Sequence, residues 1–296
     1  MRLLVTGGSG FLGRHLLDHF RTTRHPMPRF ARRGEPEVDL AGDGWPALLA
    51  ASAPAVIFHV AGRLIGTDDE LRRDNERTAA RLFEYTRRGE ARAARGPGEL
   101  RGGLRRRRQS RAPDRRDLRP QAAGSLRRDS SARRSSMPRD TRPAAGASVA
   151  RISNPVGPGM GDHLLCGTVA RQVVAIERGS QDPVMTLGDL SPLRDFVHVD
   201  DVAAALWTLA QKGADGEAYN VAAGRSTPVR EAVQHFLDAA RVRPIDVRTV
   251  DRGAIRSALP EQWLDTGKLR ALGWEPHHDL RGAVADLLAA ERGGSS

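Results

Sequence analysis

The stretch RLLVTGGSGFLGRHLLDHF, residues 2–20, gives the clearest indication of the fold. Its opening run, Leu3 to Thr6, is short and mostly apolar, which predicts a buried strand. Leucine and phenylalanine side chains then recur over residues 12–20 at the spacing of one helix face. A glycine-rich turn separates the two segments. The order strand, turn, helix predicts the first unit of a parallel α/β sheet.

Three glycines, Gly7, Gly10 and Gly13, occupy this turn. A tight strand-to-helix turn needs glycine dihedrals, and a pyrophosphate can approach the backbone closely only where no Cβ intervenes. The helix N-terminus then offers free N–H groups and a positive dipole end to the phosphates. We therefore expect Gly7, Gly10, Phe11, Leu12 and Gly13 to contact a dinucleotide.

Further strands are expected at about 28–32, at 37–40 and at 54–62, with helical segments between them. This alternation predicts an α/β chain with a Rossmann-type doubly wound parallel sheet. The first of these strands ends without the acidic residue that usually binds the ribose of NAD. Arg32 and Arg33 stand there instead and suit a 2′-phosphate, which favours NADP and leaves NAD open. Asp39 and Leu40, which end the next strand, are further candidates for the cofactor site.

The net charge of +11 is concentrated in one window, residues 87–148. That window holds 19 arginines and six acidic residues, so the rest of the chain is slightly acidic. The single cysteine excludes an internal disulfide, and no metal-ligand spacing is present. Neither a signal peptide nor a membrane span can be drawn. We expect a cytoplasmic protein with no membrane partner and no specific nucleic-acid partner.

The motifs outside the window resemble those of the extended short-chain dehydrogenases that act on nucleotide-sugars, the NAD-dependent epimerase/dehydratase family. Besides the glycine loop, the similar segments are HVAG at 59–62, Asn75 in DNER, RISNPVGPG at 151–159, RDFVHVDDV at 194–202, and TGKL with LGW at 266–274. In appearance the chain is most similar to reductases of nucleotide-linked 4-keto-6-deoxyhexoses. The resemblance covers roughly 1–86 and 149–296.

The resemblance implies a division of the chain and a set of contacts. Residues 1–152 would form the NAD(P)-binding domain, and 153–296 mainly a substrate-binding region with segments that return to the first domain. Ala61 and Gly62 would touch the nicotinamide ribose. A nucleotide-diphosphate sugar would be bound by four residues: Asn154, Arg171, Arg194 and Arg256. Arginine suits the diphosphate because its planar fork is always charged. The resemblance also suggests a homodimer.

The family's catalytic pair is missing. It consists of a tyrosine and a lysine four residues later, and the lysine lowers the pKa of a phenol that is otherwise a poor base. This chain has two tyrosines, Tyr85 and Tyr219, and its lysines are Lys212 and Lys268. Neither tyrosine has a lysine at that spacing. We therefore name no catalytic residue, and whether this chain is an enzyme stays open.

The pair would be expected inside the arginine-rich window, 87–148, which contains no Val, Ile, Phe, Tyr or Trp. Three interpretations compete. The window is a basic arm for nucleic acid; or the chain is a relative that binds ligands without catalysis; or the window is translated in the wrong frame of GC-rich DNA. We favour the frame slip, because 45 arginines against two lysines indicate such DNA and because the flanking motifs are intact.

The function expected from these observations is NAD(P)-dependent reduction of a nucleotide-diphosphate 4-keto-6-deoxyhexose. One alternative is 4-epimerisation of a nucleotide-diphosphate sugar, and another is binding of a nucleotide-sugar without turnover. The polypeptide as written is expected to be inactive.

Overall fold

The computed structural model describes residues 2–23, 40–87, 147–250 and 260–294. Residues 24–39, 88–146 and 251–259 lie outside this description, and with them the strands expected at 28–32 and 37–39 and nearly all of the arginine-rich window. No described helix is both long and apolar enough to cross a membrane.

The first described part, up to residue 87, alternates strands and helices as expected. Its elements are β1 (Leu3–Thr6), α1 (Phe11–Thr22), α2 (Gly44–Ser52), β2 (Val56–His59), α3 (Asp68–Leu71), the π-helical turn η1 (Arg72–Arg77) and α4 (Thr78–Arg87). β1 and β2 pair in parallel, with Leu3 opposite Val56. The strands predicted from the apolar runs at 3–6 and 54–62 are therefore confirmed.

The second described part begins at residue 147. Its strands are β3 (Val149–Ile152), β4 (Asn154–Val156), β5 (Val184–Leu187), β6 (Leu193–Arg194), β7 (Phe196–His198), β8 (Ala218–Val221), β9 (Thr227–Pro228), β10 (Asp246–Thr249) and β11 (Glu261–Gln262). Its helices are α5 (Leu165–Glu177), α6 (Val199–Lys212), α7 (Val229–Ala239), α8 (Gly267–Arg270) and α9 (Leu280–Gly293).

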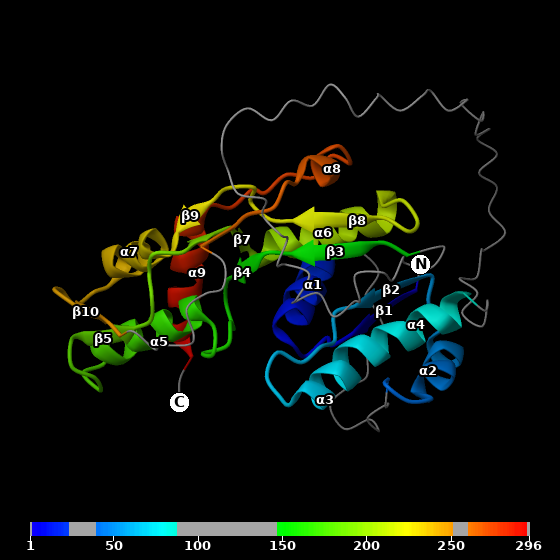
Figure 1. Cartoon of the computed structure of the whole chain (residues 1–296), viewed down its shortest axis with the longest axis horizontal. Helices are drawn as coiled ribbons and strands as arrows, with labels where there is room; N and C mark the ends of the chain where they lie inside the picture. The colour runs from blue at the N-terminus through cyan, green and yellow to red at the C-terminus, as the bar shows by residue number, and fades with distance from the viewer. Residues whose placement is uncertain (1, 24–39, 88–146, 251–259, 295–296) are drawn as a thin grey trace.

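β1 is covered on both faces, which is the mark of a doubly wound sheet. Leu3 and Val5 face one side, where they pack with α1 and with Trp207 of α6. Leu4 faces the other side and packs with Trp45 of α2 and with a leucine of α4. Figure 1 shows α1 and α6 beside each other, apart from α2 and α4. The alternation of side chains along β1 therefore creates two helical layers.

The strand pairs bring distant parts of the sequence together. β3 pairs in parallel with β8, β4 with β7, and β5 with β10. β6 pairs in parallel with β11 and antiparallel with β9. Among the described residues, β2 has a strand partner only on its β1 side and β3 only on its β8 side.

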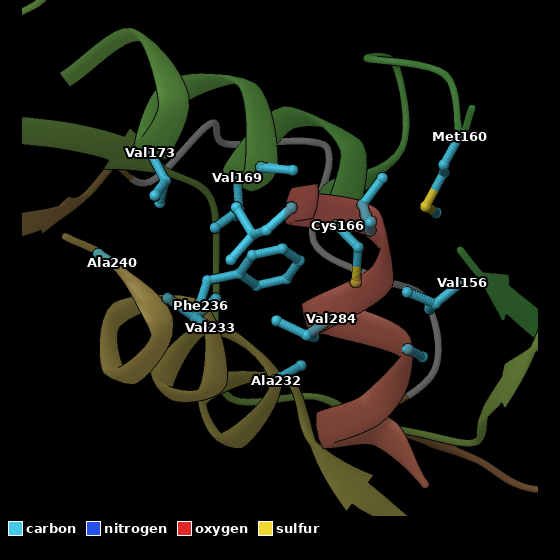
Figure 2. Close-up of a cluster of buried hydrophobic side chains, with 14 of the residues drawn as sticks. Val156, Met160, Cys166, Val169, Val173, Ala232, Val233, Phe236, Ala240 and Val284 are labelled. Atoms are coloured by element: carbon cyan, nitrogen blue, oxygen red, sulfur yellow. The ribbon is translucent and has the colours of Figure 1, made fainter. Parts of the chain in front are cut away.

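A second core lies between α5, α7 and α9. Figure 2 shows Val169 and Val173 of α5 facing Phe236 of α7 and Val284 of α9. Phe236 is fully buried. This helical cluster packs against Val156 of β4 and Phe196 of β7, and β4 begins at the candidate substrate residue Asn154.

Candidate functional site

The glycine loop after β1 packs backbone against backbone on the segment that follows β2. Gly7 has a φ of +76°, and a Cβ added there would lie 2.6 Å from the Cα of Ala61. A Cβ on Gly13 would lie 2.1 Å from the carbonyl oxygen of Gly7. Neither position has room for a side chain, so the close packing of the loop requires glycine at both. The structure thus brings together Gly7 and Ala61, which lie 54 positions apart in the sequence.

The N-terminus of α1 has the properties that a pyrophosphate needs. Gly10 is the N-cap and makes no side-chain cap. Its own N–H bonds to the Gly7 carbonyl at 2.9 Å. The next N–H groups, those of Phe11, Leu12 and Gly13, find no acceptor among the described residues. Unpaired N–H groups at a positive helix end above a loop without side chains fit a dinucleotide phosphate.

The loop after β2 is held by Asn75. Its amide oxygen accepts from the Arg63 N–H at 2.7 Å, and its amide nitrogen donates to the Arg63 carbonyl at 2.8 Å. A Cβ on Gly62 would lie 2.9 Å from the Asn75 oxygen. Asn75 lies inside the π-helical turn η1. Such turns are frequent at functional sites because they redirect one side chain.

Asn154, the candidate that would bind substrate, opens β4 beside β7. Its amide nitrogen donates to the Asp195 carbonyl at 2.9 Å and to the Ser153 hydroxyl at 3.2 Å. The Ser153 hydroxyl in turn donates to the same Asp195 carbonyl at 2.6 Å. These bonds fix the Asn154 side chain in one orientation, so its amide oxygen is the group left for a ligand.

Asp195 is fully buried and joins three loops. Its carboxylate accepts the N–H groups of Ala223 and Gly224 at 3.0 and 3.1 Å and that of Leu264 at 3.3 Å. Burial raises the pKa of Asp195 to about 6, although the backbone donors around it act in the opposite direction. Sequence reasoning quoted Asp195 only as part of a motif and missed this role, because the bonds reach residues 28 to 69 positions away.

The two described arginine candidates lie in different settings. Arg194 is in β6, two residues from the strand that pairs with Asn154, and it donates to the Leu193 carbonyl at 2.6 Å. Arg171 is in α5, where it pairs with Asp162 at 2.5 Å and lies 3.7 Å from Glu291. Arg171 is therefore engaged by two acids, one in the loop before α5 and one on α9, and Arg194 lies nearer to Asn154 along the paired strands.

Four candidates, Arg32, Arg33, Asp39 and Arg256, lie outside the described residues. Leu40, expected to end a strand, lies in a turn and packs on the cluster around Trp45. A turn is reasonable there, because the following helix α2 begins at Gly44.

The described tyrosine and lysine side chains do not form the missing catalytic pair. Tyr219 is 3% exposed, and its hydroxyl accepts the N–H of Ala214 at 2.9 Å. Lys268 lies 4.4 Å above the face of the Tyr219 ring, bonded to Glu217 and to the Ala218 carbonyl. The Lys268 ammonium over the Tyr219 ring stabilises the packing of that ring. The Tyr219 hydroxyl is occupied by the backbone N–H of Ala214. Lys212 bonds to the Leu272 carbonyl at 2.9 Å.

The N-terminus of α6 is capped by a histidine and not by one of the aspartates, Asp200 and Asp201, in its first turn. The N-cap is His198, whose Nδ1 accepts the N–H of Asp200 at 3.1 Å. Asp201 instead accepts the N–H groups of His277 and His278, at 3.1 and 3.0 Å. Helix α6 begins at Val199, directly after His198, because the buried imidazole of His198 supplies the capping atom.

Comparison with known proteins places these features in one family. The sequence model of the NAD dependent epimerase/dehydratase family matches residues 3–94 and 140–222. The GDP-6-deoxy-D-mannose reductase of Pseudomonas aeruginosa is 26% identical over 97% of this chain and 96% of its own. The dTDP-6-deoxy-L-talose 4-dehydrogenase (NAD(P)(+)) of Kitasatospora kifunensis is 31% identical over 48% of this chain and 45% of its own.

Solved structures share the fold. The RMD of Pseudomonas aeruginosa complexed with NADPH has a TM-score of 0.69, 22% identity and 98% coverage of both chains. The UDP-glucose 4-epimerase of Thermus thermophilus in complex with NAD has a TM-score of 0.67, 20% identity and full coverage of both chains. The Rossmann-type fold expected from the sequence is confirmed. This chain belongs to the NAD dependent epimerase/dehydratase family, whose members include nucleotide-sugar reductases, epimerases and dehydratases.

Proposed function

We propose that this chain binds NAD(P) at the glycine loop and a nucleotide-diphosphate sugar beside Asn154, at the start of β4. The observation that carries the proposal is the backbone packing of Gly7 on Ala61 and of Gly13 on Gly7, which leaves no room for side chains. Phe11, Leu12 and Gly13 would face the pyrophosphate with their N–H groups, Gly10 would let it approach the backbone, and Ala61 and Gly62 would lie at the nicotinamide ribose.

The proposed reaction of this site is reduction of a nucleotide-linked 4-keto-6-deoxyhexose. Two observations favour it over 4-epimerisation. A GDP-6-deoxy-D-mannose reductase aligns with 97% of the chain. Arg32 and Arg33 in the sequence favour NADP, the cofactor on which a reductase usually draws. The division into a cofactor domain, 1–152, and a substrate region, 153–296, is part of the same proposal.

The bound cofactor would supply a hydride to the C4 carbonyl of the sugar. The residues of this chain would bind and orient the partners: Asn154 through its amide oxygen, and Arg194 through its guanidinium at the diphosphate. Arg171 and Arg256 are weaker candidates for the same diphosphate. The carbonyl oxygen needs a proton as the hydride arrives. Neither described lysine is placed to activate a tyrosine for this transfer.

The polypeptide as written would therefore bind its ligands without turnover. The family model leaves residues 95–139 unmatched, and this stretch lies within the arginine-rich window where the tyrosine and lysine would be expected. A frame slip in the coding DNA explains why the flanks match on both sides. A true relative that lost catalysis is the second candidate, and the absence of the pair is the observation that favours it.

Resequencing the DNA that encodes residues 80–155 separates these two candidates. A frame that restores a Val- and Ile-rich strand and a Tyr-x-x-x-Lys helix would identify a reductase or epimerase, and the corrected chain would be assayed. A confirmed sequence with no such frame would leave the ligand-binding relative.

Titration of the chain as written with NADPH, followed by the fluorescence of the nicotinamide, tests the cofactor site. We expect saturable binding of NADPH, tighter than that of NADH, and no oxidation when a GDP-4-keto-6-deoxyhexose is added. Measurable turnover by this chain would contradict the assignment of a missing base, and absence of binding would contradict the cofactor site.

A further inference from the structure

His15 joins three segments that the proposed function assigns to different tasks. It lies on α1, one turn after the glycine loop. Its Nδ1 lies 2.6 Å from a carboxylate oxygen of Asp200, at the start of α6. Its Nε2 lies 2.8 Å from the carbonyl oxygen of Pro158, in the loop that follows β4. The His15 side chain is 13% exposed, whereas the Asp200 side chain is 51% exposed, so the bond to Pro158 is the better shielded of the two.

Both partners of His15 are acceptors. A carboxylate and a peptide carbonyl have no proton to give, and a neutral imidazole carries only one N–H. The two bonds therefore exist together only when His15 is an imidazolium. The loss of its proton would leave one of the two oxygens without a donor, and the contact to Asp200 would lose its charge.

The charges around His15 agree with this protonation state. Burial acts to lower its pKa, but the bonds to Asp200 and Pro158 and the charges of Asp200 and Asp18 outweigh burial and raise it. The bond to His15 lowers the pKa of Asp200, and the charges of His15, His198 and His278 act in the same direction. His198 donates from Nε2 to Asp286 of α9, 3.2 Å away. The neighbouring Arg14 reaches the same loop as His15, with Nη2 3.3 Å from the Gly159 carbonyl.

The loop that His15 holds has little freedom of its own. A Cβ on Gly157 would lie 2.5 Å from a methyl group of Val199, and Gly159 has a φ of +76°. Pro158, between these two glycines, follows Asn154 by four residues. A displacement of α1 relative to α6 would therefore move the Pro158 carbonyl and, through Val156, the short strand β4 that begins at Asn154.

We propose that His15, as an imidazolium, is a positioning residue that couples the cofactor site to the nucleotide-sugar site. It would transmit the seating of a dinucleotide on α1 to the loop 157–159 and so to Asn154. The coupling would be present in acid and lost in alkali, where His15 is neutral. This inference rests on the proposed function, because it needs both ligands to bind.

The test measures the dissociation constant of GDP, used as the probe, with and without saturating NADPH at pH 6 and at pH 9. The ratio of the two constants at one pH is the coupling factor. For the unaltered chain we expect NADPH to tighten GDP binding by about fivefold at pH 6. The factor should fall to about one at pH 9.

His15→Gln is the informative variant, because glutamine can donate one of the two bonds but carries no charge. We expect its coupling factor to be about one at both pH values, while GDP alone still binds. His19→Gln is the matched control, one turn further along the same helix, where the ring packs edge-on against Phe20. This control should keep the coupling of the unaltered chain.

Several results would overturn the inference. A coupling factor that does not change with pH, or one that His15→Gln preserves, would remove His15 from the link although NADPH and GDP still bind. A chain that binds neither ligand would instead overturn the proposed function, and the coupling with it. A proton NMR titration of the ligand-free protein adds an independent readout: a His15 midpoint at or below pH 6.5 would refute the imidazolium.

Discussion

The glycine loop after β1 and the strand pair β4–β7 hold their proposed ligand-facing groups in different ways. In the loop, Gly7 and Gly13 are fixed by contacts between backbone atoms that exclude any Cβ. At β4, Asn154 is fixed by hydrogen bonds to Ser153 and to the Asp195 carbonyl. The first arrangement depends on residues that lack a side chain, and the second on side chains that have the right partners.

This difference explains which residues the sequence could identify. A glycine trio by itself is a weak signal, but one that follows a strand and opens a helix predicts the site. An asparagine or aspartate can cap a turn almost anywhere. Their roles follow only when β4, β7 and the loop at 223–224 come together.

Gly13→Ala should have the largest effect on cofactor binding. The new Cβ would meet the Gly7 carbonyl at 2.1 Å, and neither atom can move without shifting α1 or the loop. We expect NADPH affinity to fall by about 100-fold or more, and the free energy of unfolding by about 3 kcal/mol. Fluorescence titration and urea unfolding measure the two effects.

Gly293→Ala is the matched control for this change, because nothing lies within 4 Å of its added Cβ. It should leave both the affinity and the unfolding free energy unchanged. If Gly13→Ala bound NADPH as the unaltered chain does, the phosphate site would not lie at this loop.

Asp195→Ala should reduce stability by about 3 kcal/mol, because three backbone N–H groups would lose their buried acceptor. Asp195→Asn keeps one acceptor oxygen and should lose less. Urea unfolding gives the stability, and GDP titration in the absence of urea gives the second readout. GDP binding should weaken in both variants while NADPH binding changes little. If the affinities for GDP and for NADPH fell equally, the strand pair β4–β7 and the glycine loop would not respond independently to the loss of Asp195.

His59 should make stability depend on pH. Burial lowers its pKa to about 4, from an ordinary value of 6.5. The unfolded chain therefore takes up a proton that the folded chain does not, so stability is present above pH 6.5 and is lost as pH falls toward 4. We expect a loss of about 2 kcal/mol over this range.

Urea unfolding at pH 4.5, 5.5 and 7 measures this loss, and His59→Gln, which cannot titrate, should remove it. His163→Gln, at an exposed position, serves as the control. An unchanged slope in His59→Gln would mean that other groups cause the acid sensitivity.

Asn75→Ala should have the smallest of these effects. It removes both bonds to the Arg63 backbone, but that segment is exposed and water can replace the lost partners. We expect NADPH affinity to fall by about fivefold, with a change in unfolding free energy of about 1 kcal/mol. Asn75→Asp keeps the acceptor for the Arg63 N–H and should recover part of the affinity. No change in NADPH binding would separate the π-helical turn from the cofactor site.

The α/β fold, the positions of β1, β2 and α1, and the glycine loop could all be predicted from the sequence. These features are predictable because periodicity and the steric demands of glycine act over a few neighbouring residues. The sequence also showed that no tyrosine is followed by a lysine at the catalytic spacing, a fact that needs no coordinates.

Four features could be seen only in the folded chain. Asp195 joins three loops, and His198 caps α6. Tyr219 and Lys268 form a packing pair, and His15 spans α1, α6 and the loop at 157–159. Except for the local cap at His198, these contacts join residues that lie 28 to 185 positions from each other in the sequence. Hydrogen-bonding side chains can be satisfied by many partners, and the sequence does not say which partner the fold will bring near. Packing of the strands and helices makes that selection.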